Sequence, residues 1–119
     1  EHRAMAGLSM GSLQTSITAF EHSELFSYVG VFSGFVQDIL TQNQSHLTEK
    51  NKESFRENNK LFFRGIGAED RFIDFFKSDD EFLEKSKIKC ERKIYKGDHE
   101  WKVWRRLYDF AQLIFREDN

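Results

Sequence analysis

The sequence predicts an α/β fold in which a mostly parallel sheet of about four strands carries helices on both faces. Two observations predict this fold. Short segments rich in β-favouring residues alternate along the chain with longer segments whose apolar residues recur at helical spacing. The composition is that of a globular domain, with 32% charged and 39% apolar residues among 119. We therefore expect one domain over residues 1–119.

The first part of the chain predicts a strand, a helix and a second strand. Residues 3–8 are short and apolar, which is typical of a buried strand. Residues 12–22 place apolar side chains at helical spacing, and Ser12 is able to cap the start of this helix. Residues 27–35 are rich in β-favouring side chains until Gly34 ends the run.

The segment 37–59 is strongly polar and predicts one or two exposed helices. It could be a lid or substrate loop over a site, or a solvated connection between two strands. Loop statistics favour the connection, so we expect residues 37–59 to be a polar excursion within the domain.

The second part of the chain continues the alternation. Residues 60–67 predict a third strand, which Gly67 ends. Residues 69–86 predict a helix with one apolar stripe. That stripe consists of Phe72, Phe75, Phe76 and Leu83. Residues 87–97 alternate polar and apolar side chains, as expected of a strand near a sheet edge. Residues 100–115 form a helix with a wide apolar face that should dock on the sheet.

Charge and cysteine content exclude several classes of protein. The formal charge of −2 shows no electrostatic footprint for nucleic acid or an anionic membrane. No apolar run approaches the roughly 18 residues that span a bilayer. Cys90 is the only cysteine, which excludes an intrachain disulfide and a multi-cysteine metal site.

A Gly-x-Ser-x-Gly motif occupies residues 7–11, with Ser9 at its centre. It follows a predicted strand and precedes a predicted helix, which is the setting of a nucleophile elbow. Glycines are expected at both flanks because this turn is tight and bulky neighbours would clash. The helix N-terminus offers backbone N–H groups to an oxyanion. The simpler interpretation is a serine between two glycines.

A serine hydroxyl needs a base to take its proton, and His99 is our candidate. It follows a predicted strand and precedes the last helix, where the active sites of open α/β sheets lie. His2 precedes the motif, His22 ends the first helix, and His46 lies in the polar segment. A surface histidine in an ordinary turn is the alternative for His99.

The acid that orients the base is expected after the third strand. Asp70 is our choice, with Glu69 in reserve. Asp98 is adjacent to the base in sequence, and adjacent residues seldom present the required geometry. Three further aspartates of the following helix are interpreted as solvated or capping residues. They are Asp74, Asp79 and Asp80.

Four segments together resemble the C-terminal half of the esterase D-like family of α/β-hydrolases. They are AGLSMG, LFSYVGVFSG, GIGAED and GDHEWKVWRRLYDFAQLIF. This family includes feruloyl and acetylxylan esterases (carbohydrate esterase family 1), enterochelin esterases and S-formylglutathione hydrolases. The likeness covers nearly the whole chain except residues 37–59, and is greatest to the esterase modules attached to bacterial xylanases.

The resemblance implies a catalytic triad of Ser9 as nucleophile, Asp70 as acid and His99 as base. It also implies that the backbone N–H of Met10 is one oxyanion donor. The chain departs from the family pattern at several positions, although none removes a catalytic side chain. Ser12 and Asp98 stand where glycine is usual, and Ser23 and Gln112 where proline is frequent.

Length is the larger departure from the family, whose members run to roughly 250 residues, as large single α/β domains do. The strands before the elbow, and the second oxyanion donor with them, are expected to lie outside these residues. We therefore expect half an enzyme that is inactive alone, and that pairs with its missing half or with a second copy.

The resulting expectation is a serine esterase that acts through an acyl-enzyme on feruloyl or acetyl esters of plant polysaccharide. No metal and no organic cofactor are needed. The acyl pocket is expected at Leu8, Ser33, Gly34 and Trp101. The resemblance implies a secreted bacterial enzyme, with the cytoplasm as the alternative location.

Two other interpretations belong to different classes. The chain could be a non-catalytic hydrolase-fold module used for binding or assembly. A separate patch could stack sugars or bind anions, although a core-facing helix with solvated arginines is the more common arrangement. That patch consists of Trp101, Trp104, Arg105 and Arg106.

Overall fold

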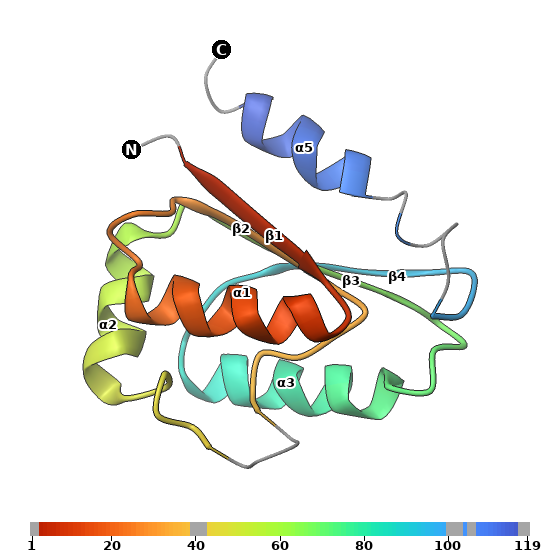
Figure 1. Cartoon of the computed structure of the whole chain (residues 1–119), viewed down its shortest axis with the longest axis horizontal. Helices are drawn as coiled ribbons and strands as arrows, with labels where there is room; N and C mark the ends of the chain where they lie inside the picture. The colour runs from red at the N-terminus through yellow and green to blue at the C-terminus, as the bar shows by residue number, and fades with distance from the viewer. Residues whose placement is uncertain (1–2, 39–42, 100–103, 105–106, 117–119) are drawn as a thin grey trace.

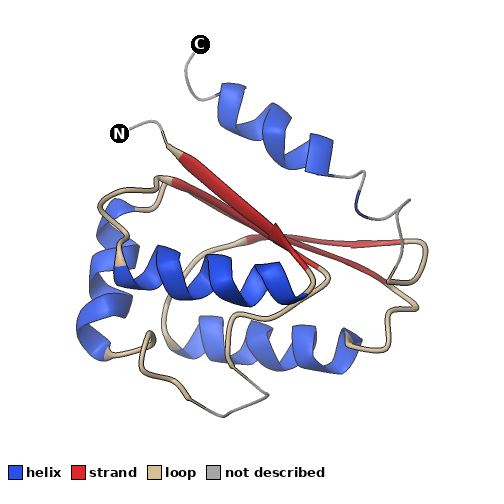
Figure 2. Cartoon of the chain, viewed as in Figure 1, coloured by secondary structure: helices blue, strands red, loops and turns tan. Residues whose placement is uncertain are grey.

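The computed structural model describes residues 3–38, 43–99, 104 and 107–116. Within these described residues, four strands and four helices alternate as predicted (Figures 1 and 2). In chain order they are β1 (Ala4–Leu8), α1 (Met10–Glu21), β2 (Tyr28–Phe32), α2 (Glu49–Asn58), β3 (Leu61–Gly67), α3 (Ile73–Lys85), β4 (Glu91–Tyr95) and α5 (Leu107–Arg116).

The strands form one parallel sheet in the order β1-β2-β3-β4. Its register pairs Leu8 with Phe32, Phe32 with Gly65, and Gly67 with Tyr95. Consequently the carboxyl ends of all four strands lie at one edge of the sheet. The α/β fold class with a four-stranded parallel sheet is confirmed.

Helices cover both faces of the sheet, with α5 on one side and α1, α2 and α3 on the other (Figure 1). Alternate residues of β2 face opposite ways, so Val29 and Val31 join the core beneath α1–α3 while Tyr28 and Phe32 join the core beneath α5. The expected docking of the last helix is confirmed by Phe110, which is 3% exposed in that second core.

The polar segment contributes to the core, so the expectation of a purely solvated connection is wrong. Phe55 of α2 stacks on Phe20 of α1 with ring centroids 4.3 Å apart. His46 and Leu47 are also buried. One apolar side chain on a short polar helix is enough to anchor it, because an aromatic ring buries a large area.

Several local expectations are corrected. The segment 3–8 is not buried, because β1 is an edge strand of the described sheet and two of its alanines are exposed. Ser12 does not cap α1, since that helix begins at Met10 and Ser12 lies buried inside it. Phe75 leaves the predicted stripe of α3 and is 40% exposed. The edge position of β4 is confirmed.

No helix in the described part of the chain has the length and apolar character to cross a membrane.

Candidate active site

Ser9 sits on the sharp turn between β1 and α1. Its backbone has φ 55° and ψ −123°, and its N–H donates to the Phe32 carbonyl at 2.7 Å. A positive φ is rare for a residue with a Cβ and costs roughly 1–3 kcal/mol. The turn places the Ser9 side chain at the carboxyl edge of the sheet and at the N-terminus of a helix, as the motif predicts.

The two glycines of the motif are not equivalent. A Cβ on Gly7 would lie 2.2 Å from the Gly11 carbonyl oxygen and 2.4 Å from Thr15 Oγ1, so only glycine fits there. A Cβ on Gly11 would meet nothing within 4 Å. The expectation that both flanks exclude a side chain is therefore correct for Gly7 and wrong for Gly11.

Ser12 supports the elbow from inside α1. Its hydroxyl donates to the Ser9 carbonyl oxygen and accepts the N–H of Phe35 at 2.8 Å. Ser16 adds a second bond to the same segment, because its hydroxyl donates to the Phe35 carbonyl at 3.0 Å. The residues after β2 are thus tied to the first two turns of α1.

The structure brings Ser9, His99 and Asp70 together from the ends of β1, β4 and β3. Ser9 Oγ lies 2.8 Å from His99 Nε2, and His99 Nδ1 lies 2.7 Å from Asp70 Oδ2. The Asp70 side chain is 0% exposed and that of His99 is 22% exposed. An ionised carboxylate only accepts, so Nδ1–H donates to Asp70 and Nε2 is left to accept the Ser9 hydroxyl proton.

Asp70 is held by its own local contacts. Its Oδ1 accepts the Phe72 N–H at 2.9 Å, and its backbone N–H donates to the Gly67 carbonyl at 3.1 Å. One carboxylate oxygen therefore fixes the start of α3 while the other faces the imidazole.

The other acidic candidates are not buried as Asp70 is. Glu69 is exposed. Asp98 is also exposed, and its Oδ1 accepts the backbone N–H of His99 at 2.7 Å. Asp98 therefore shapes the turn that carries the base.

The other two described histidines have different surroundings. His46 is buried, with its Nε2 2.9 Å from the Val36 carbonyl oxygen. His22 ends α1 at the surface, and His2 lies outside the described residues.

The loop that carries His99 packs closely on the end of β3. A Cβ on Gly67 would lie 2.3 Å from the Gly97 carbonyl oxygen. Gly97 has φ 134°, a conformation that L side chains rarely adopt, whereas the φ of Asp98 is not positive. This explains why the chain needs glycine at position 97 and tolerates a side chain at 98.

The described residues that were expected to form an acyl pocket differ in burial and in location. Ser33 and Gly34 are buried beside the elbow, and a Cβ on Gly34 would lie 1.5 Å from Ser12 Oγ. Leu8 is partly buried against the core beneath α5. Trp101, like Arg105 and Arg106 of the alternative patch, lies outside the described residues.

Two aspartates of α3 were misread from the sequence as solvated or capping residues. Asp79 is 2% exposed and accepts the N–H of Val36 at 2.8 Å and the side-chain amide of Gln37 at 2.9 Å. Burial raises the pKa of the Asp79 carboxyl, and these hydrogen bonds lower it by less. Its spacing from Phe76 and Leu83 places it on the buried stripe of the helix, which is the signal that could have identified it.

Asp80 pairs with two arginines of the sheet. Its carboxylate contacts the buried Arg64 of β3 and lies 2.7 Å from Arg92 of β4. The Arg64 guanidinium also stacks on the Phe76 ring at 4.1 Å. A buried cation requires such partners, so this pair serves packing of α3 on the sheet.

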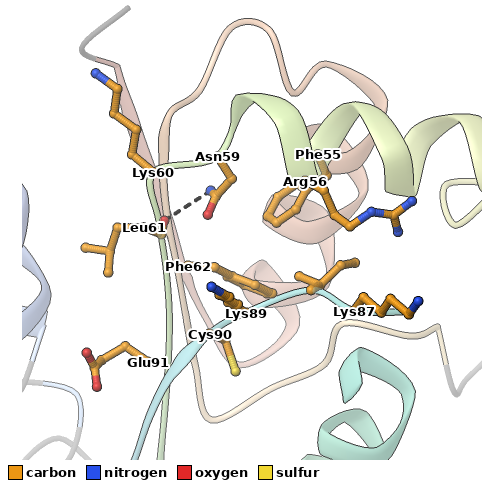
Figure 3. A pocket seen from close by; sticks show the side chains of 11 residues that line it. Phe55, Arg56, Asn59, Lys60, Leu61, Phe62, Lys87, Lys89, Cys90 and Glu91 are labelled. Carbon is orange, nitrogen blue, oxygen red and sulfur yellow. Dashed lines mark hydrogen bonds between the residues drawn. The ribbon is translucent and has the colours of Figure 1, made fainter. Parts of the chain in front are cut away.

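A cavity of about 450 Å³ opens at the amino ends of β3 and β4 (Figure 3). Ser9 follows the carboxyl end of β1, so it lies at the opposite edge of the sheet. Phe55, Phe62 and several basic side chains line the cavity. Its lysines are solvent-exposed, and the Arg56 guanidinium donates to the Ser86 carbonyl at 2.7 Å. This cavity is separate from the candidate active site.

Across the described ranges, no three His, Cys, Asp or Glu side chains gather as a metal site. A serine hydroxyl, an imidazole and a buried carboxylate in this order can act chemically as nucleophile, base and orienting group in acyl transfer.

The parallel sheet and its elbow place the chain in the α/β-hydrolase class. The chain belongs to the Esterase family, described as "Putative esterase", whose sequence model matches residues 1–112. The predicted resemblance is thereby confirmed. An endo-1,4-beta-xylanase/feruloyl esterase of Xylanibacter ruminicola is 32% identical over 117 residues, which cover 97% of this chain and 14% of that protein.

Solved structures share the fold. A ferulic acid esterase matches with a TM-score of 0.81 at 22% identity, covering 97% of this chain and 51% of its own. The S-formylglutathione hydrolase FrmB of Staphylococcus aureus matches with a TM-score of 0.69 at 16% identity, covering 93% and 50%. The fluorophosphonate-binding serine hydrolase FphF of the same organism has a TM-score of 0.76 at 14% identity, covering 93% and 53%. The chain thus spans about half the length of these structures.

Proposed function

We propose that this chain carries the catalytic residues of a serine carboxylic-ester hydrolase. The observation that carries the proposal is the continuous contact from Ser9 through His99 to Asp70, at 2.8 and 2.7 Å. A serine alone is a poor nucleophile, and this relay is what activates it.

The mechanism follows from the hydrogen bonds. Ser9 Oγ attacks the ester carbonyl carbon while its proton passes to His99 Nε2. Asp70 holds the imidazole and stabilises its cationic form. His99 then protonates the leaving alcohol, and water hydrolyses the acyl-Ser9 ester with His99 again as base.

The oxyanion of the tetrahedral intermediate needs backbone donors. Met10 is the first residue of α1, and a first-turn N–H has no acceptor within its own helix. This N–H adjoins the nucleophile, so we assign it as one donor. Because the chain spans half of its solved relatives, we place the second donor outside these residues.

The substrate class is inferred from the relatives. A feruloyl esterase and a ferulic acid esterase both match this chain over 97% of its length, which favours feruloyl esters of plant polysaccharide. Acetyl esters are the second choice. Polysaccharides are too large to enter a cell, so we infer that the protein acts outside it.

A fluorophosphonate probe tests the nucleophile in the full-length protein. The probe should label the wild type and Ser78→Ala, which removes an exposed serine of α3, but not Ser9→Ala. Methyl ferulate and acetylated xylan then rank the acyl groups by kcat/KM. A wild-type protein that stays unlabelled would support the non-catalytic binding module instead.

A further inference from the structure

The His99 imidazole retains one freedom of movement that its triad bonds do not remove. The contacts to Asp70 and Ser9 hold its two nitrogens. Rotation about the line that joins those nitrogens would tilt the ring at little cost to either hydrogen bond, because both bonds point nearly along that line. Something else must fix this tilt if Nε2 is to take a proton along the Ser9 O–H direction.

Two aromatic rings restrict the tilt. The Phe72 ring lies at 5.5 Å from the imidazole with an interplanar angle of 70°, and the Trp104 ring at 5.2 Å with 86°. Both are edge-to-face contacts, the favoured geometry of aromatic pairs. Phe72 is fixed by the first turn of α3, whereas Trp104 depends on a partner of its own.

That partner is Ser33, at the end of β2. The Trp104 Nε1–H donates to Ser33 Oγ at 3.0 Å. Ser33 is 1% exposed, and its backbone N–H donates to the Gly65 carbonyl at 2.8 Å. The acceptor is therefore locked in place within the sheet edge.

The backbone of Ser33 is itself unusual, with φ 57°. Glycine or asparagine is the common choice in this left-handed region, and a buried serine there bears strain. Strained positions gather at functional sites, where the surrounding structure holds them. The hydroxyl that this position supplies to Trp104 gives a reason for serine here.

We propose that Ser33 is a positioning residue that acts through Trp104 to hold the His99 ring in its catalytic orientation. This role rests on the proposed function, and the acyl-pocket role expected for Ser33 from the sequence stays a separate prediction. The contacts run from Ser33 at the end of β2 to the Trp104 indole, and from the indole to the His99 ring.

A double-mutant cycle on the full-length protein tests the pair. Ser33→Gly deletes the hydroxyl and suits a positive φ, so it should fold. Trp104→Phe keeps an aromatic ring and deletes the N–H. Each should lower the rate of fluorophosphonate labelling of Ser9 roughly twofold to tenfold, the worth of one hydrogen bond. The double variant should be no slower than the slower single variant, since all three lack the same bond.

Ser16→Ala is the matched control, because it removes another buried serine hydroxyl that bonds the segment after β2. It should leave the labelling rate unchanged. A second readout is the NMR signal of the His99 Nδ1 proton bonded to Asp70. That proton should exchange faster with water in Ser33→Gly and Trp104→Phe, which a merely structural role would not cause in the folded protein.

The inference is overturned if both single variants label at the wild-type rate, or if their losses multiply in the double variant. A wild-type protein that never reacts with the probe would instead contradict the proposed function. In that case the Nδ1 proton signal decides the positioning role by itself, and an unchanged exchange rate in both variants would overturn it.

Discussion

The hydroxyl of Ser12 accepts the backbone N–H of Phe35 at 2.8 Å, which ties the first turn of α1 to the segment that follows β2. The family that the sequence resembles usually has glycine at position 12. The serine therefore adds a bond across the elbow, and its side chain fills the space that a neighbouring Cβ would need. Residue 34 fits beside Ser12 only because glycine has no Cβ that would clash with the serine hydroxyl.

The first prediction concerns this contact. A Cβ on Gly34 would lie 1.5 Å from Ser12 Oγ and 2.4 Å from the Ser9 carbonyl oxygen. We expect Gly34→Ala to lower the free energy of unfolding by roughly 1–3 kcal/mol or more, as overpacking does. Ser12→Gly in the same chain should recover part of the loss, because it removes the nearest atom. Urea denaturation of both variants measures this, and a stable Gly34→Ala would contradict it.

The second prediction compares the two motif glycines. Gly7→Ala should destabilise by roughly 1–3 kcal/mol, since its Cβ would meet the Gly11 carbonyl at 2.2 Å. Gly11→Ala has open space and lies in α1, so it should be neutral or stabilise by up to about 1 kcal/mol. Thermal unfolding of the two variants checks which of them is the less stable. Equal losses would show that the clash at Gly7 is relieved by movement of the turn.

The order of elements was predictable from the sequence because periodicity and turn residues are local signals. The strand before Ser9, the amphipathic α3 and the edge strand β4 each follow from a short window of residues. The proximity of Ser9, Asp70 and His99 was predictable for a different reason. Each follows the end of a strand by no more than four residues, and parallel strands place their carboxyl ends at one edge.

Contacts between segments that are distant in the sequence could not be predicted from these local signals. The polar helix α2 carries one buried ring, Phe55, and nothing nearby in the sequence indicates that Phe20 lies opposite it. The bonds of Asp79 to Val36 likewise join residues 43 apart. Side-chain bonds to backbone N–H groups have no periodicity, so the sequence gives only the helical stripe on which Asp79 falls.

The third prediction follows from the raised pKa of Asp79. Burial lifts it above the ordinary value of 3.8, so the folded protein holds the proton more tightly than the unfolded chain. The stability that this protonation contributes is fully present below about pH 3.8 and is lost as pH rises through the folded pKa. The free energy of unfolding of the wild type, relative to Asp79→Asn, should therefore fall from pH 3.8 toward neutrality.

Urea denaturation at several pH values checks the third prediction. Asp74→Asn removes an exposed carboxylate of the same helix and is the matched control. The free energy of unfolding of Asp74→Asn relative to the wild type should not show the pH dependence expected for Asp79→Asn. The prediction would be contradicted if the difference in free energy of unfolding between the wild type and Asp79→Asn did not change with pH across this range.

The fourth prediction concerns the 119 residues alone. The chain spans about half of its solved relatives, and we place one oxyanion donor outside it. Loss of one such donor lowers turnover roughly 10²–10³-fold, so the isolated chain should hydrolyse methyl ferulate at least that much more slowly than the full-length protein. A rate close to that of the full-length protein, abolished by Ser9→Ala, would show that these residues suffice.

The final prediction decides which acid orients the base. Asp70 Oδ2 lies 2.7 Å from His99 Nδ1, whereas Glu69 is exposed. Asp70→Asn offers an amide that can donate to Nδ1, which favours the wrong tautomer and leaves Nε2 protonated toward Ser9. We expect kcat to fall by about 10³–10⁴, as loss of the acid does in triads of this kind. Glu69→Gln should retain the wild-type kcat within about twofold, because its side chain is exposed and Asp70 is the residue bonded to the imidazole. Steady-state hydrolysis of methyl ferulate by the two full-length variants measures the difference, and the reverse order would transfer the role of the acid to Glu69.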